Sequence, residues 1–121
     1  MSENDGSDLL EREDIGDVTV VRVKVSMLRS DDMTDNLFGQ VYSLIDDAGR
    51  QKLVLNLAVV EYLASVALGK LVVLIRKTRA ADGRLALCHV TRSVSRLLEI
   101  TYLADLMSIY GEERDAVQSF A

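Results

Sequence analysis

The stretch LNLAVVEYLASVALGKL, residues 55–71, decides the fold prediction. Its first residues form an apolar run that is typical of a strand in the interior of a sheet. A short loop follows, and from Ser65 onward Leu68, Leu71 and Ile75 recur at helical spacing. Serine is among the preferred N-cap residues, so we expect Ser65 to cap this helix. The stretch predicts a strand-loop-helix unit with one hydroxyl at the positive end of a helix dipole, where backbone N–H groups favour an anion.

Further strands are predicted on both sides of this unit. The clearest is the run at residues 18–25, which is rich in valine and alternates with Arg22 and Lys24 near its end. A turn at Ile15-Gly16-Asp17 would join it to a short edge strand at residues 9–13. Other apolar runs predict strands at residues 52–57, 84–89 and 106–110.

Helical spacing of apolar residues also recurs between these strands. One helix is expected to begin at an N-cap Thr34 and to end before Gly49. Another begins near Ser93, and a terminal helix has Glu112 and Glu113 in its first turn. Because helices alternate with strands after the first hairpin, we expect an α/β fold. It consists of a β-hairpin and then βαβα units, with a mixed sheet of four to five strands covered by helices.

Composition limits the range of functions. The chain has 121 residues, which predicts one domain at residues 9–121 after a disordered acidic leader at residues 1–8. Its net charge is −5 and no basic stripe stands out, which argues against nucleic-acid binding. The chain has no signal-peptide pattern and no apolar run of about 20 residues, so we expect a cytoplasmic protein that does not insert into membranes.

No catalytic or metal-binding pattern is present in the sequence. His89 is the only histidine and Cys88 the only cysteine, so a Cys/His metal site is not expected. The aspartates at positions 31, 32 and 35 lack the ligand spacing of a calcium loop. Phosphate cradles, nucleophile elbows and paired catalytic carboxylates are also missing. We therefore expect a binding protein without enzymatic activity, metal or cofactor.

Three segments resemble the STAS domain of anti-sigma-factor antagonists when they are taken in this order. They are the unit around Ser65, the glycine-led strand at residues 83–90 and the helix at residues 93–103 with its Val-x-x-Leu-Leu pattern. The resemblance extends from about Leu9 to Phe120. It implies a binding module that docks a GHKL-type serine kinase acting as an anti-sigma factor, or other STAS proteins. It also implies that phosphorylation breaks this docking.

The resemblance places Ser65 at the phosphoacceptor position of the family. Ala64 stands where the family usually has aspartate, Val66 where a second hydroxyl residue is common, and Ala67 where glycine is usual; Leu68 and Gly69 match. The motif is therefore degenerate. The partner-binding residues expected from the resemblance and from the apolar character of the loop are Asp31, Asp32, Tyr62, Leu63, Ala64, Val66, Leu68 and Gly69. We expect Tyr62, Leu63 and Val66 to be exposed beside Ser65.

The sequence leaves two other functions open. Ala64 and Ala67 motivate a STAS scaffold subunit that forms homo- or hetero-oligomers without a phosphoryl cycle. The aliphatic composition is also compatible with a STAS accessory subunit of a transport complex.

Overall fold

Five strands pair into one sheet with the strand order β1-β2-β4-β6-β7. The computed structural model describes residues 9–121, so the predicted leader lies outside the described residues. The strands are β1 (Leu10–Ile15), β2 (Val18–Val23), β4 (Lys52–Asn56), β6 (Arg84–Cys88) and β7 (Ser108–Tyr110). β1 pairs antiparallel with β2, and the remaining pairs are parallel. The predicted α/β fold with a mixed sheet is confirmed.

The first two strands form the predicted hairpin. Ile15 pairs with Val18, which leaves Gly16 and Asp17 as a two-residue loop. Gly16 has a φ of +62°, as the turns that suit twisted antiparallel strands require. The exposed residues of β1 include the charged run from Glu11 to Asp14, and such charges discourage another strand from pairing with the edge.

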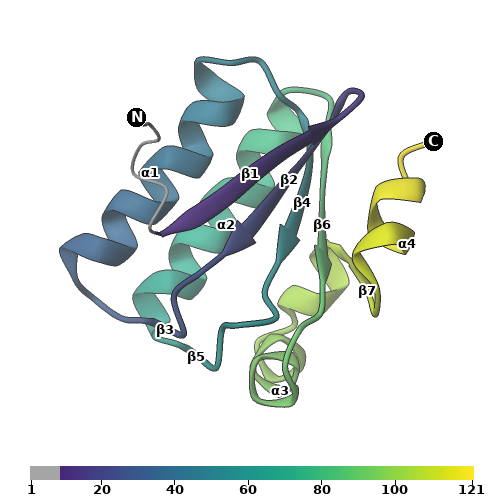
Figure 1. Ribbon diagram of the computed structural model, residues 1–121. Coiled ribbons are helices and arrows are strands. Elements are labelled where there is room, and N and C mark those ends of the chain that lie inside the picture. The colour runs from purple at the N-terminus through teal and green to yellow at the C-terminus, as the bar shows by residue number, and fades with distance from the viewer. Residues whose placement is uncertain (1–8) are drawn as a thin grey trace.

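The connections between parallel strands determine where the helices lie. α1 (Asp32–Asp46) joins β2 to β4, and α2 (Ser65–Ala80) joins β4 to β6. The chain crosses the sheet in one direction and such crossovers are right-handed, so both helices must cover the same face. Figure 1 shows them on one side of the sheet and α4 (Glu113–Gln118) on the other.

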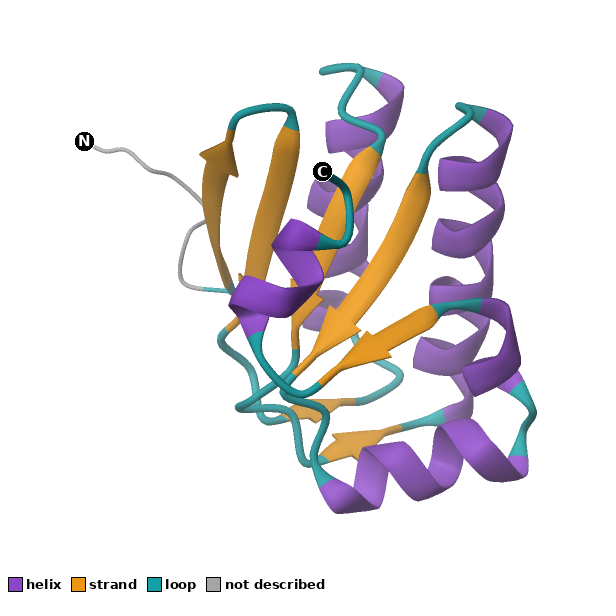
Figure 2. Ribbon diagram, turned by 90° about the vertical axis from the view of Figure 1, so that its right-hand side faces the viewer, coloured by secondary structure: helices purple, strands orange, loops and turns teal. Residues whose placement is uncertain are grey.

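The carboxyl ends of the parallel strands carry a further layer. α3 (Arg92–Ile100) lies across this edge of the sheet, and a 3-10 helix, η1 (Leu103–Leu106), leads from it to β7 (Figure 2). The last strand therefore begins at Ser108 and not at residue 106, because Leu106 ends this helical turn.

Apolar side chains fill both faces of the sheet. The larger core lies under α1 and α2 and is mainly aliphatic, with Leu53, Leu74 and Leu87 fully buried. A smaller cluster that includes Val20, Val54, Ala86 and Cys88 lies under α4. Because β4 contributes buried residues to both clusters, it is the interior strand that its apolar run predicted.

Two short strands were not predicted. β3 (Met27–Leu28) pairs in parallel with β5 (Tyr62–Leu63), beyond the carboxyl edge of the main sheet. The Tyr62 N–H donates to the Ser26 carbonyl at 3.2 Å, and the Ala64 N–H donates to the Leu28 carbonyl at 2.8 Å. These bonds connect the loop after β2 to the loop after β4. The strand predicted at residues 18–25 is confirmed over residues 18–23, and it ends two residues earlier than predicted, at Val23.

The predicted helix starts also need correction. Thr34 is not the N-cap of α1; Asp31 is, because its carboxylate accepts a hydrogen bond from the Thr34 N–H at 2.9 Å while the Thr34 side chain is buried. In α3 the hydroxyl of Thr91 caps the helix, which begins at Arg92, one residue before the predicted Ser93. The terminal helix α4 was predicted, and its first residue is Glu113.

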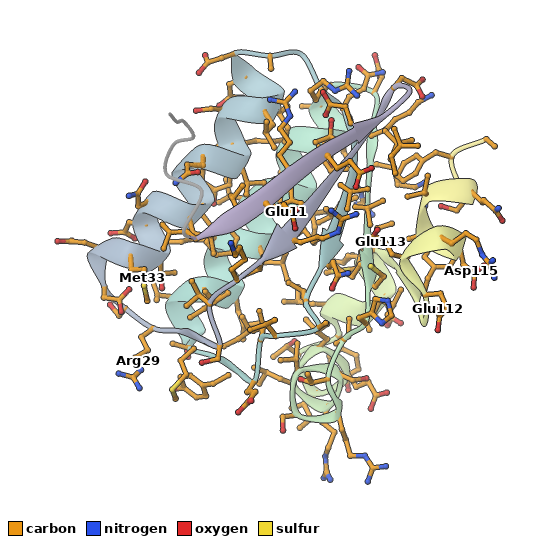
Figure 3. All side chains as sticks on the ribbon, in the orientation of Figure 1. Glu11, Arg29, Met33, Glu112, Glu113 and Asp115 are labelled. Carbon is orange, nitrogen blue, oxygen red and sulfur yellow. The ribbon has the colours of Figure 1, made fainter. Side chains whose placement is uncertain are left out.

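Glu113 holds α4 against the sheet. Arg22 on β2 donates to its two carboxylate oxygens from Nε at 2.9 Å and from Nη2 at 2.8 Å, and the Asn56 amide on β4 donates at 2.9 Å. Figure 3 shows Glu113 between α4 and the sheet, with Glu112 and Asp115 on the outer side. The Arg22 hydrogen bonds, followed by that of Asn56, hold the pKa of Glu113 below its ordinary value of 4.5.

The lowered pKa of Glu113 predicts an acid-dependent contribution to stability. Its carboxylate stabilises the fold above the ordinary carboxyl pKa, and this contribution is lost as the pH falls through the lower folded-state value. We expect Glu113→Gln to lower the free energy of unfolding by about 1–2 kcal/mol at pH 7. The difference from wild type should shrink towards pH 3. Urea titrations at both pH values measure it.

Glu112→Gln is the matched control for this prediction, because Glu112 is exposed and precedes the same helix. We expect it to leave the unfolding free energy unchanged at both pH values. An equal loss for Glu113→Gln at pH 7 and pH 3 would contradict the account.

Candidate functional site

The residues that the sequence singled out lie at the carboxyl edge of the sheet. The loops that leave β2, β4 and β6 all begin there, because the carboxyl ends of parallel strands lie at the same edge. β3 and β5 join the first two loops, and α3 follows the third. We call the exposed part of β3 and β5, together with the first turns of α1 and α2, the candidate docking surface.

Ser65 is the first residue of α2 and not its cap. The N-cap is Ala64, which has extended backbone angles (φ −72°, ψ 163°) and no side chain that can accept a hydrogen bond. The predicted capping role of Ser65 is therefore wrong. The hydrogen bond from the Ala64 N–H to Leu28 helps to hold Ala64 extended. Among the described residues the Ser65 hydroxyl has no hydrogen-bond partner, and the side chain is exposed.

The side chains around Ser65 divide into exposed and buried ones. Tyr62 and Val66 are 47% and 38% exposed, as predicted. Leu63 is only 6% exposed, so the expectation that it faces solvent is wrong; it points into the larger core, since side chains alternate along β5. Ala67 is fully buried in the same core, and its methyl group therefore cannot touch a docked partner.

Met27 is a member of this surface that the sequence did not indicate. It pairs with Tyr62 in the β3–β5 register, and its side chain is 38% exposed. A two-residue strand leaves too short a pattern to be recognised, so the pairing is evident only in the structure. Exposed apolar side chains that lie together are typical of protein interfaces.

The two acidic residues of the predicted surface have different roles. The carboxylate of Asp31 is occupied in capping α1, whereas Asp32 is exposed in the first turn and makes no described ion pair. Arg29 and Met33 lie at the same corner (Figure 3). Leu68 is half-buried and Gly69 exposed on the first two turns of α2. The structure therefore brings the predicted residues to one edge, although Leu63 faces inward.

A hollow of about 360 Å³ opens beside Ser65, between α2, β5 and α3. Its apolar lining comes from Tyr62, Leu63, Leu68, Val94 and Leu97, and its polar lining from Glu61, Ser65 and Ser93. We call it the Ser65 hollow. Because Ser65 and Ser93 stand in the first turns of α2 and α3, two helix N-termini meet at its rim.

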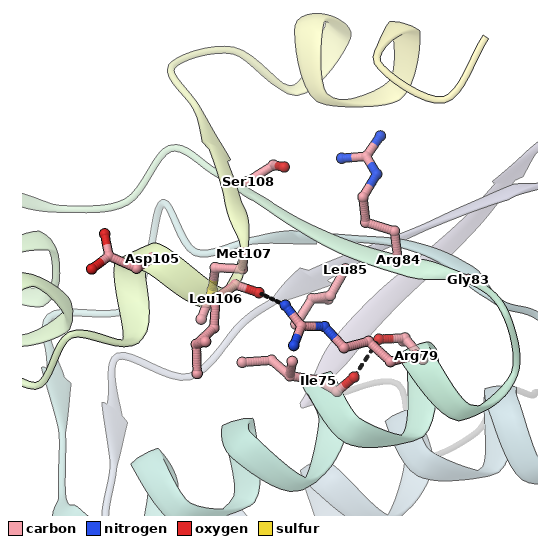
Figure 4. A pocket seen from close by; sticks show the side chains of 10 residues that line it. Ile75, Arg79, Gly83, Arg84, Leu85, Asp105, Leu106, Met107 and Ser108 are labelled. Carbon is pink, nitrogen blue, oxygen red and sulfur yellow. Dashed lines mark hydrogen bonds between the residues drawn. The ribbon is translucent and has the colours of Figure 1, made fainter.

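A second hollow, of about 300 Å³, lies between the end of α2 and β7 (Figure 4). Arg79 reaches across it and donates to the Leu106 carbonyl at 2.9 Å. Arg84 is turned towards α4, where it donates to Ser119 and lies 4.2 Å from the Phe120 ring. Both guanidinium groups are thus occupied by structural contacts.

The residues considered for metal binding and thiol chemistry are Cys88, His89 and the acidic side chains. Among residues 9–121 no group of three or more His, Cys, Asp or Glu side chains could hold a metal ion. Burial raises the pKa of the Cys88 thiol to about 12, so this thiol is unreactive. His89 accepts a hydrogen bond from the Glu113 N–H at 3.4 Å.

The larger core also contains a cavity of about 20 Å³ between α1, α2 and the sheet. This volume is enough for about one water molecule and is too small for an acyl chain. No helix in the described part of the chain is long and apolar enough to cross a membrane.

The family model of the STAS domain matches residues 10–116. The chain therefore belongs to the STAS domain family. Anti-sigma-factor antagonists of this family bind protein partners and are generally not enzymes.

Several solved structures share the fold. The anti-sigma-factor antagonist (STAS) domain protein from Planctomyces limnophilus has a TM-score of 0.81 at 20% identity, covering 93% of this chain and 97% of the other. An anti-sigma factor antagonist from Mycobacterium paratuberculosis has a TM-score of 0.75 at 24% identity, covering 91% of each chain. The Bacillus cell fate determinant SpoIIAA in its phosphorylated form has a TM-score of 0.71 at 16% identity, covering 93% and 99%.

Proposed function

We propose that this chain is a regulatory protein-binding module of the anti-sigma-factor antagonist type, acting in the cytoplasm. Its partner is a GHKL-type serine kinase that serves as an anti-sigma factor, or another STAS protein. The observation that carries the proposal is the exposed, unpartnered hydroxyl of Ser65 at the start of α2. The exposed side chains of Tyr62, Val66 and Met27 lie on the same surface and would be covered by the partner.

Ser65 is the phosphoacceptor in this proposal. A phosphate would add about −1.5 to −2 charges at a helix N-terminus, where the dipole and the free N–H groups stabilise an anion. The fold would tolerate this because the hydroxyl is exposed. A partner that covers Ser65 would instead have to desolvate the charge, at a cost of several kcal/mol. SpoIIAA, which shares the fold, is known in a phosphorylated form.

Gly69 lies near the start of α2 and would let a partner backbone approach the helix closely. It lies within α2, where glycine costs about 1 kcal/mol relative to alanine. A Cβ added there would meet no heavy atom within 4 Å, and the φ is not positive, so the fold itself has no need of this glycine. Close approach of a partner backbone to α2 would explain why a side chain is absent.

A scaffold subunit without a phosphoryl cycle is the second candidate. It would dock other STAS proteins through the same surface. Ala64 favours it, because a kinase of the usual kind would find no carboxylate beside the Ser65 hydroxyl. Ala67 favours neither candidate, because its side chain is buried.

Ser65→Asp is the variant that tests the switch. The tagged chain is purified from its native host, the co-purifying proteins are identified by mass spectrometry, and the Kd of the purified partner is measured by calorimetry. We expect Ser65→Asp to weaken binding at least tenfold and Ser65→Ala to retain it. Since exposed substitutions change stability within about 0.5 kcal/mol, the Tm should be nearly unchanged.

Ser43→Asp, which adds the same charge on an exposed position of α1, serves as the control and should bind normally.

Incubation of the chain with the partner and ATP, followed by peptide mass analysis, then separates the two candidates. Phosphate on Ser65 supports the kinase; a STAS partner that leaves Ser65 unmodified supports the scaffold. Equal binding by Ser65→Asp and wild type would contradict both the switch and the docking surface.

Gly69→Ala is expected to separate stability from binding. It should raise the free energy of unfolding by about 1 kcal/mol, because alanine is the better helix former. It should also weaken partner binding, because the partner's backbone would meet the new methyl group. Gly39→Ala is the matched control, since Gly39 also lies in a helix with nothing within 4 Å of an added Cβ. It should stabilise to a similar degree and leave binding unchanged, and unchanged binding by Gly69→Ala would count against close approach at α2.

A further inference from the structure

The outward side of α2 differs from that of α1, although both helices cover the same face of the sheet (Figure 1). The exposed side chains along α1 are mainly polar, such as Asp35, Asn36 and Ser43. On α2, by contrast, Val66 and Val73 are 38% and 40% exposed. A helix that is apolar on its outward side as well as on its core side is typical of a helix that is covered on both sides.

The exposed residues of α2 follow the spacing of a helix-packing seam. Val66, Gly69, Val73, Arg76 and Ala80 are separated alternately by three and four residues, and all five are exposed. We call them the α2 stripe. Their spacing is that of the a and d positions of a coiled coil, through which one helix packs against another. The pattern therefore indicates that the structure which covers α2 is itself a helix.

Helix stability does not explain the composition of the α2 stripe. Valine loses side-chain freedom in a helix, and glycine is a poor helix former, so exposed helix positions favour other residues. A Cβ added at Gly69 would meet no heavy atom within 4 Å, so the fold leaves room for a side chain there. A second helix, however, can approach most closely where the side chains at the contact are small.

Charges at the two ends of the α2 stripe indicate which helix packs there. On the side that faces α1, Lys70 and Lys77 already form ion pairs with aspartates of that helix. Arg79 donates to the backbone of η1. Of the described charged residues on α2 and on the loop that leads into it, two remain without an ion pair. They are Glu61, which lies beside the first turn, and Arg76, which lies towards the other end; both are exposed.

An antiparallel second copy of α2 matches both the apolar residues and the charges. A two-fold axis midway between Val66 and Val73 places Val66 of each copy against Val73 of the other. Arg76 lies about 10 Å along the helix from this midpoint, so it reaches the N-terminal end of the other helix, where Glu61 is exposed. A parallel pair would bring the two arginines together, and like charges in contact are unfavourable.

We propose that this chain forms a weak homodimer in which α2 packs antiparallel against α2 of a second copy. The 16 residues of α2 extend over about 24 Å, which limits the contact to the small interfaces that are typical of transient complexes. Self-association does not rest on the proposed function, because it needs neither a kinase nor a phosphate on Ser65. Since the second copy covers Val66 and Gly69, it would compete with the protein partner for the first turns of α2.

Sedimentation equilibrium of the full chain over a wide range of concentrations tests the proposal. We expect a reversible monomer–dimer equilibrium whose Kd rises at least tenfold in Val73→Glu and in Arg76→Glu. The double variant Glu61→Arg/Arg76→Glu exchanges the two charges and should recover the dimer that Arg76→Glu loses. Because the substituted residues are exposed, the Tm of each variant should be nearly unchanged.

Ile15→Glu and Arg114→Glu are the matched controls. Ile15 is an exposed β-branched residue on β1, and Arg114 is an exposed arginine on α4, on the other side of the sheet. Both variants should dimerise as the wild type does. A chain that sediments as a monomer at every concentration, or a dimer that Val73→Glu and Arg76→Glu leave intact, would overturn the proposal.

Cysteine crosslinking tests the antiparallel orientation. Cys88 is fully buried and does not interfere. A mixture of Val66→Cys and Val73→Cys chains should form a disulfide-linked dimer under mild oxidation. Each variant alone should link much more slowly, because like positions lie about 10 Å apart along the paired helices, too far for a disulfide. Rapid linking of either variant alone would overturn the antiparallel pair.

Failure of this inference can be distinguished from failure of the proposed function. If the chain is monomeric but Ser65→Asp releases its natural partner, the proposed function stands and the dimer is wrong. If the chain dimerises through α2 but the natural partner ignores Ser65→Asp, the dimer stands and the proposed switch is wrong.

Discussion

The parallel pairing of β4 with β2 on one edge and β6 on the other is the constraint on which the rest of the structure depends. It buries β4 on both faces and requires a crossover helix on each side. Because these crossovers are right-handed, α1 and α2 lie together and their N-termini emerge at the same edge of the sheet. Asp32 is far from Tyr62 and Ser65 in the sequence. The pairing of β4 with β2 brings all three residues to one surface.

A second set of interactions holds that edge in place. Glu113 accepts hydrogen bonds from β2 and β4, and the Asn56 side chain that reaches it also accepts from the Ala58 N–H at 3.0 Å. Ala58 begins the loop that continues to β5 and Ser65. The same side chain thus contacts both α4 and the base of the docking loop. The polar network under α4 therefore also contacts the loop that leads to the candidate docking surface.

The sequence predicted those elements whose patterns are long enough to specify them. The valine-rich run at β2, the apolar run at β4 and the periodicity of α2 each predicted the observed element. β3 and β5 were missed because two-residue strands depend on pairing with each other and carry no periodic signal. Ser65 was expected to be a cap from residue preference, yet backbone bonding at Ala64 starts the helix one residue earlier. Leu63 was expected to be exposed as an apolar loop residue beside Ser65, and the alternation of side chains along β5 turns it inward.

The proposed function places the docked partner on the edge around the N-terminus of α2. Amide hydrogen exchange of the chain, measured alone and in complex with its co-purified partner, maps the surface that the partner covers. We expect slowed exchange at residues 61–69, with β1 and α4 unchanged. Protection confined to β1 or α4, with residues 61–69 exchanging as in the free chain, would contradict it.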